Sequence, residues 1–78
     1  MKDKWQEVAA NILKSELARR GLKYPDLEGK LVAMGSNYSV NILRLKIFRG
    51  SFSFSFFLEC MKAIGAKNLD LESYLGEL

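Results

Sequence analysis

The sequence predicts an all-α fold, a single domain of five helices that takes in residues 1–78. Apolar residues recur at intervals of three and four in several segments, which is the period of an amphipathic helix. Residues that favour helix ends (Asp, Ser, Pro and Gly) flank these segments. The one stretch that alternates with a period of two, residues 51–58, has no second strand with which to pair.

The first predicted helix begins after Asp3 and ends at Gly21. Asp3 and Gln6 have the spacing of a capping box, and Gly21 can adopt the left-handed conformation that ends a helix. We interpret Glu7 and Glu16 as ordinary surface charges. The apolar face consists of Trp5, Val8, Ala9, Ile12, Leu13 and Leu17, and we expect Trp5 to anchor the helix in the core.

The second predicted helix runs from Pro25 to about Met34, since proline is tolerated in the first turn of a helix. Its inward residues are Leu27, Leu31 and Met34. Gly29 lies inside it, where glycine costs about 1 kcal/mol relative to alanine. We therefore expect another helix to approach closely at Gly29.

The third predicted helix runs from Val40 to about Phe48, with Ser39 as its N-cap. Val40, Leu43 and Ile47 share one side, whereas Ile42 and Leu45 project from the opposite side. This helix therefore carries apolar groups on both of its faces.

The fourth predicted helix begins after Ser53 and ends at Gly65. A helix is favoured over a strand here because it turns Phe57, Leu58, Met61 and Ile64 toward one core. Asn68 is the expected cap of a last short helix that carries Leu69, Leu71, Tyr74 and Leu75 and folds back over the bundle.

Composition narrows the classes of function. The formal net charge of +3 and the pI near 9.2 favour a polyanion or an acidic membrane surface as partner. The chain has no histidine and one cysteine, Cys60, which we expect to be a small buried hydrophobe. We therefore expect no catalytic residue, no metal site, no cofactor and no enzymatic activity.

No run approaches the roughly 18 apolar residues needed to span a bilayer and no secretion signal is evident, so a cytoplasmic protein without a membrane partner is expected.

The order of segments resembles a known family. The pieces are Arg20-Gly21-Leu22 followed by Asp26-Leu27 and Lys30-Leu31, then Ile47-Phe48-Arg49-Gly50, then residues 57–65 and residues 69–75. Together they are similar to the lambda-repressor-like helix-turn-helix family, the Cro and C1 or xenobiotic-response-element type of small regulators. The chain departs from that family in its longer segment between Leu31 and Arg49.

The resemblance implies a DNA-binding transcriptional regulator that binds double-stranded DNA, and we expect it to act as a homodimer with the third helix in the major groove. It implies that Tyr24 and Ser53 lie beside phosphates and that Asn41 and Arg44 reach base edges. Further positive charge to neutralise phosphates would come from Lys23, Lys46 and Arg49. These basic residues could instead be a solvated helix surface, Asn41 a helix-start hydrogen bonder, and Tyr24 a ring packed on Leu27.

A second hypothesis is a helical protein-interaction or self-assembly module with the same fold. Ile42, Leu45 and Phe48 replace the polar residues expected on a base-reading surface, and they would form its protein interface. The five phenylalanines are expected mainly in the core, and a ligand-binding or base-stacking cluster is the alternative. Their number is high for one small domain, which favours burial of some rings against a second copy.

Overall fold

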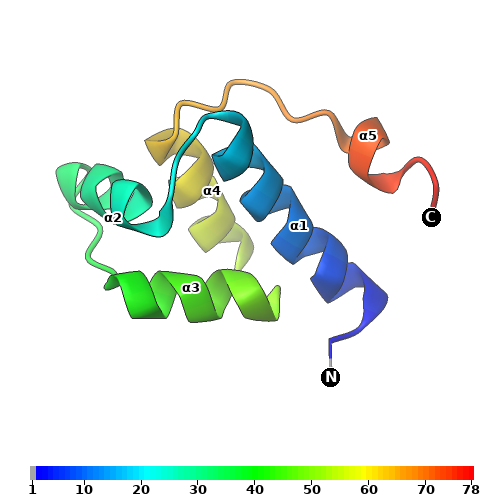
Figure 1. The fold of residues 1–78 in the computed structure, drawn as a ribbon, viewed down its shortest axis with the longest axis horizontal. Coiled ribbons are helices and arrows are strands. Elements are labelled where there is room, and N and C mark those ends of the chain that lie inside the picture. The colour runs from blue at the N-terminus through cyan, green and yellow to red at the C-terminus, as the bar shows by residue number, and fades with distance from the viewer. Residues whose placement is uncertain (1) are drawn as a thin grey trace.

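Five α-helices and no strand are present in residues 2–78, the part of the chain that the computed structural model describes (Figure 1). They are α1 (Lys4–Arg19), α2 (Tyr24–Ala33), α3 (Val40–Arg49), α4 (Phe54–Ala63) and α5 (Leu71–Leu75). The prediction of an all-helical fold is therefore confirmed. In particular, the alternating stretch enters a helix at Phe54 and forms no strand.

Several helix ends are fixed by the residues that the sequence indicated. The Gln6 backbone N–H donates to Asp3 Oδ1 at 2.8 Å, and the Asp3 N–H donates to Gln6 Oε1 at 3.2 Å, which completes the capping box. The hydroxyls of Ser39 and Ser53 accept hydrogen bonds at the starts of α3 and α4. Beyond α1, Gly21 has a φ of +67°, a conformation that suits glycine.

The starts of α2 and α5 differ from the prediction. α2 begins one residue earlier, at Tyr24, because the Asp26 carboxylate accepts a hydrogen bond from the Lys23 N–H at 2.8 Å. At α5 the cap is Asp70 and not Asn68, since Asp70 Oδ1 accepts from the Ser73 N–H and its carbonyl accepts from the Ser73 hydroxyl. Leu69 consequently lies before α5 and not within it.

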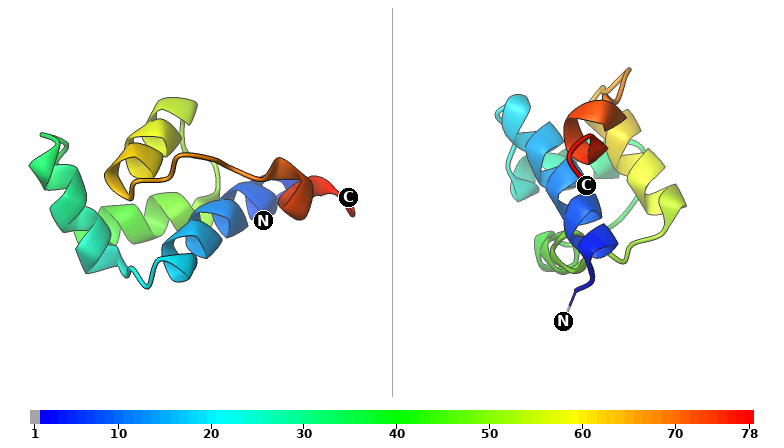
Figure 2. Two further views of the ribbon diagram at one scale, coloured as in Figure 1. Left: turned by 90° about the horizontal axis from the view of Figure 1, so that it is seen from above. Right: turned by 90° about the vertical axis from the view of Figure 1, so that its right-hand side faces the viewer.

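The core lies among the first four helices. α1 packs against α3, and α2 packs against both α3 and α4, while α5 lies against α1. α2 and α5 occupy opposite ends of the molecule (Figures 1 and 2). The buried core residues are Leu13, Leu17, Leu27, Leu31, Leu43, Ile47, Phe56, Cys60, Met61 and Ile64.

Four predictions about packing are wrong. Trp5 is 60% exposed, because the first turn of α1 lies at the edge of the bundle (Figure 1). Met34 follows the last turn of α2 and is exposed. Leu58 is exposed because it lies two residues from buried Phe56, on the other side of α4. No atom lies within 4 Å of a Cβ built on Gly29, so no helix approaches there.

The phenylalanines divide into two groups. Phe56 is buried, and Phe52 and Phe57 are half-buried against the core. Phe48 and Phe54 are exposed, so core filling accounts for only part of the set.

Candidate nucleic-acid interface

α3 presents two chemically different sides. Leu43 and Ile47 are fully buried on the inner side. On the outer side Ile42, Leu45 and Phe48 are 47%, 51% and 56% exposed. The expectation that α3 carries apolar groups on both faces is confirmed.

Three cationic side chains from three different segments surround the start of α2. Lys14 of α1, Lys23 at the N-cap of α2 and Arg44 of α3 line a hollow of about 390 Å³. Its apolar lining includes Leu17, and Arg44 Cζ lies 5.5 Å from the centroid of the Tyr24 ring. This is a cation–π distance, so the Tyr24 ring is packed beside Arg44. The hollow therefore combines an apolar lining with a positively charged rim.

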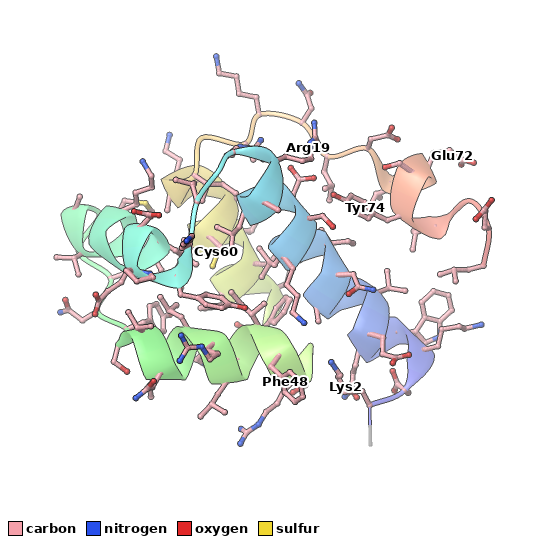
Figure 3. The ribbon with its side chains drawn as sticks, in the orientation of Figure 1. Lys2, Arg19, Phe48, Cys60, Glu72 and Tyr74 are labelled. Carbon is pink, nitrogen blue, oxygen red and sulfur yellow. The ribbon has the colours of Figure 1, made fainter. Side chains whose placement is uncertain are left out.

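A second group of cations surrounds Phe48 at the end of α3. Lys2 Nζ lies 4.4 Å and Lys14 Nζ 5.7 Å from the centroid of the Phe48 ring. Lys2 Nζ also donates to the Phe48 carbonyl at 2.6 Å, where a cation suits the negative end of the helix dipole. Arg49 lines a neighbouring hollow together with Lys2 and Phe48, and Figure 3 shows Lys2 and Phe48 close together beside the start of α1.

We define the basic face as Lys2, Lys14, Lys23, Arg44 and Arg49. The ion pairs within residues 2–78 are those of Glu16 with Arg19 and Arg20, so none of the five cations is paired with a carboxylate there. Unpaired cations gathered on one surface create a positive potential that attracts anions. The basic face is therefore a surface of the described chain that suits an anionic partner.

Two of the predicted DNA-binding residues lie elsewhere. Lys46 Nζ lies 5.4 Å from the Phe56 ring centroid, and Lys46 and Arg44 are about 200° apart around α3. Ser53 caps α4 and lines a different hollow, which has an apolar lining that includes Phe54. Of the predicted DNA-binding residues, the basic face therefore contains Lys23, Arg44 and Arg49, with Tyr24 beside Arg44. It contains neither Lys46 nor Ser53.

Asn41 occupies the first turn of α3 and is exposed. Its Oδ1 lies 3.4 Å from Arg44 Nη1, longer than a typical N–H···O hydrogen bond. Asn41 and Arg44 are therefore adjacent on the outer side of α3, and their polar groups are only weakly engaged with each other.

The joint between α2 and α3, residues 34–39, is held by Glu59 of α4. The hydroxyl of Ser36 donates to Glu59 Oε2 at 2.6 Å, and the hydroxyl of Tyr38 donates to Oε1 at 2.9 Å. The hydrogen bond from Ser36, then that from Tyr38, and the charge of Lys46 lower the pKa of Glu59, which burial alone would raise. The Tyr38 ring also packs edge-on against Phe56, with centroids 5.3 Å apart. These contacts fix the joint and hence where α3 begins.

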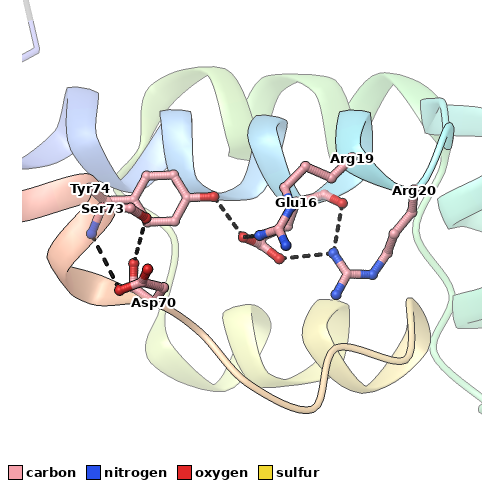
Figure 4. A network of polar contacts seen from close by, with 6 residues as sticks. All are labelled: Glu16, Arg19, Arg20, Asp70, Ser73 and Tyr74. Carbon is pink, nitrogen blue, oxygen red and sulfur yellow. Dashed lines mark hydrogen bonds and ion pairs between the residues drawn. The ribbon is translucent and has the colours of Figure 1, made fainter.

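Glu16 is buried, contrary to the prediction of a surface charge. Its side chain is 0% exposed and accepts hydrogen bonds from the Tyr74 hydroxyl at 2.6 Å and from Arg20 Nη1 at 2.8 Å (Figure 4). The hydrogen bond from Tyr74 is the largest influence on the pKa of Glu16 and lowers it, with help from Arg20 and Arg19. A carboxylate held in this way is charged and fully engaged, so it links α5 to α1 and is unsuited to proton transfer.

Sequence reasoning missed Lys2 and Lys14 as members of the candidate interface. Neither has a local signal, because each reaches Phe48 only through the packing of the first part of the chain against α3. Gly50, which follows α3, allows α1 and α3 to lie close together. It faces the Gln6 backbone of α1, where there is no room for a Cβ.

Other kinds of site find little support in the described residues. Cys60 is buried, and burial raises the pKa of its thiol to about 12. Residues 2–78 contain no group of three or more Cys, Asp or Glu side chains placed to hold a metal ion. No helix in that range has both the length and the apolar character needed to cross a bilayer.

Comparison with known proteins gives one match. No curated protein and no solved structure matches the chain. Residues 5–69 match the family described as Domain of unknown function (DUF6471). They include α2 to α4, all of α1 except Lys4, and every residue of the basic face except Lys2. Because this match takes in most of the chain, the protein belongs to the DUF6471 family.

Proposed function

We propose that this protein is a small DNA-binding regulator that binds duplex DNA through a helix-turn-helix formed by α2, residues 34–39 and α3. The observation that supports the proposal is the basic face, whose five unpaired cations lie at two hollows that Arg44, Phe48 and Arg49 of α3 help to line. Phosphate neutralisation by such cations supplies most of the non-specific affinity of DNA-binding proteins. In this proposal the outer side of α3 enters the major groove.

Asn41 and Arg44 are the proposed base readers. An asparagine can bond adenine at two positions and an arginine can bond guanine at two positions. Both side chains are exposed on α3 and only weakly engaged with each other. Ile42 and Leu45 beside them would contact thymine methyl groups, which are apolar features of the major groove.

Lys23, Tyr24 and Arg49 are the proposed phosphate contacts at the two ends of this surface. Lys46 and Ser53 lie outside the basic face and would meet phosphates only at its margin. Lys46 lies close enough to Glu59 for its charge to lower the pKa of that carboxyl, and the negative carboxylate partly cancels the positive potential that a phosphate would meet there.

We also propose that the protein acts as a homodimer. Phe54 is exposed at an apolar hollow of about 480 Å³ between α1, α4 and the start of α5. The hollow is lined by Ala9, Ile12, Phe52, Ser53, Phe54, Phe57, Leu69 and Leu71. Burial of an aromatic ring in such a hollow on a second copy would give the symmetric contact common among soluble oligomers.

Binding to a labelled random-sequence duplex, measured by anisotropy as salt is raised from about 50 to 200 mM, tests the proposal. We expect binding at low salt, with an affinity that falls by about 0.9 logarithmic unit per decade of salt for each phosphate contact. Arg44→Gln should weaken binding. Lys67→Gln, which removes the same charge from the linker on the opposite side from α3 (Figure 1), should not. Undetectable binding at low salt would reject the function.

A second candidate function is a protein-interaction module, and the exposed group Ile42, Leu45 and Phe48 favours it. Replacing Ile42 and Leu45 together with Ser should then reduce the mass seen in sedimentation without changing helix content. An unaltered mass would count against this candidate.

A further inference from the structure

We propose that Lys14 of α1 binds a phosphate of the DNA backbone, and that Phe48 is the positioning residue that holds its ammonium group beside α3. This inference rests on the proposed function and extends it to a helix that lies outside the helix-turn-helix. It also gives Phe48 a role other than contact with a protein partner.

The position of Lys14 supports its role as a phosphate contact. Its side chain lines the hollow that it shares with Lys23 and Arg44, and its Nζ lies 5.7 Å from the Phe48 ring centroid. Lys14 therefore lies between the two groups of cations and is the one member common to both. A phosphate bound by Lys14 would lie between the phosphates that are proposed to bind at the start of α2 and at the end of α3.

The surroundings of Phe48 support its role as the positioning residue. The ring is exposed, yet two ammonium groups from outside α3 lie within about 6 Å of its centroid, a distance at which the ring attracts cations. A ring occupied in this way offers less apolar surface to another protein. It also restrains a long lysine side chain that would otherwise lose rotamer entropy when it binds a phosphate.

The charge variants test the role of Lys14. In the same anisotropy titration, Lys14→Gln should reduce the salt slope by about 0.9, the value for one phosphate contact. Lys14→Arg should retain the slope, since it retains the charge. Lys67→Gln serves as the matched control and should also retain it. Both positions are exposed, and far-ultraviolet circular dichroism will check that the three variants are folded.

The ring variant tests the role of Phe48. Phe48→Leu retains an apolar side chain but removes the ring, and should weaken duplex binding about three-fold. In a Lys14→Gln background the same change should have a smaller effect, because the two residues act through one contact. A purely structural role would lower affinity equally in both backgrounds.

The outcomes separate the two proposals. A wild-type protein that does not bind the duplex would overturn both. A wild-type protein that binds with the expected salt slope, together with a Lys14→Gln variant of unchanged slope, would overturn this inference alone. Equal effects of Phe48→Leu in the two backgrounds would overturn the positioning role of the ring.

Discussion

Glu16 shows how a single residue can tie a terminal helix to the rest of a small protein. Its carboxylate binds the Tyr74 hydroxyl, 58 residues away in the sequence, and the Arg20 guanidinium one turn along α1. Arg19 also lies within ion-pair distance, but its side chain is 65% exposed and contributes little. Since α5 has five residues, its position depends on contacts of this kind more than on its own helix.

We expect Glu16→Ala to lower the free energy of unfolding by about 2–3 kcal/mol, because it removes charged hydrogen bonds from a buried position. Tyr74→Phe should cost about 1–2 kcal/mol, since it removes only the hydroxyl. Urea denaturation followed by circular dichroism measures both. Glu7→Ala changes an exposed carboxylate of the same helix and should cost less than about 1 kcal/mol. Equal effects of Glu7→Ala and Glu16→Ala would contradict the assignment.

At the scale of elements, the end of α3 is joined to the start of α1 by a contact that permits no side chain. Gly50 follows α3 with a φ of +68°, and a Cβ at this position would overlap the carbonyl oxygen of Gln6. Lys2 Nζ also donates a hydrogen bond to the Phe48 carbonyl in the last turn of α3. Two helices distant in the sequence therefore share one corner of the molecule.

We expect Gly50→Ala to destabilise the protein by about 2–4 kcal/mol, from backbone strain together with displacement of α1. Gly21→Ala is a matched control, because Gly21 has nearly the same φ of +67° but nothing within 4 Å of an added Cβ. Gly21→Ala should lower the free energy of unfolding only by the backbone strain of a left-handed alanine, about 1 kcal/mol. Thermal denaturation of both variants measures the difference, and equal losses would mean that the contact with Gln6 carries no weight.

The elements could be predicted from the sequence where their signals are local. Asp3, Ser39 and Ser53 cap helices because a side-chain oxygen three residues before an N–H is sufficient for a cap. The start of α5 was misplaced because Asn68 and Asp70 are both good caps, and only tertiary packing chooses between them. Local chemistry therefore determined most ends of the helices but not all.

At the scale of the whole molecule, the free energy of unfolding should depend on pH through two carboxyl groups at low pH and one thiol at high pH. The pKa values of Glu16 and Glu59 lie below the ordinary value of 4.5, chiefly through hydrogen bonds from Tyr74 and Ser36. The unfolded chain therefore takes up protons first as the pH falls, so this stabilisation is present above about pH 5 and is lost below it. Burial raises the pKa of Cys60 from 9.0 to about 12, so the unfolded chain releases that proton first and stability is lost above about pH 9.

We accordingly expect the urea midpoint to be flat between about pH 6 and 8 and to fall on both sides. Glu59→Gln should lower the plateau and make the acid limb shallower, because glutamine does not titrate. A midpoint that rises as the pH falls below about 5 would contradict the direction of the carboxylate pKa values.

The candidate site was predicted in part. Arg44, Arg49 and Asn41 could be placed on the outer side of α3 because helical periodicity and the buried positions of Leu43 and Ile47 fix that side. Lys2 and Lys14 could not be assigned to the site from the sequence, because their position beside Phe48 depends on how the first part of the chain packs against α3. Glu16 was misjudged for the same reason, because its principal partner lies in a helix 58 residues away.

The exposure of Trp5 has a practical consequence for spectroscopy. It is the chain's one tryptophan, and in the native state its indole already lies largely in water on the first turn of α1. Its emission maximum should therefore shift little when the protein denatures, and soluble quenchers should reach it in both states. A molecule that binds at the first turn of α1 would shield the same indole from water. The emission of Trp5 should therefore report such binding.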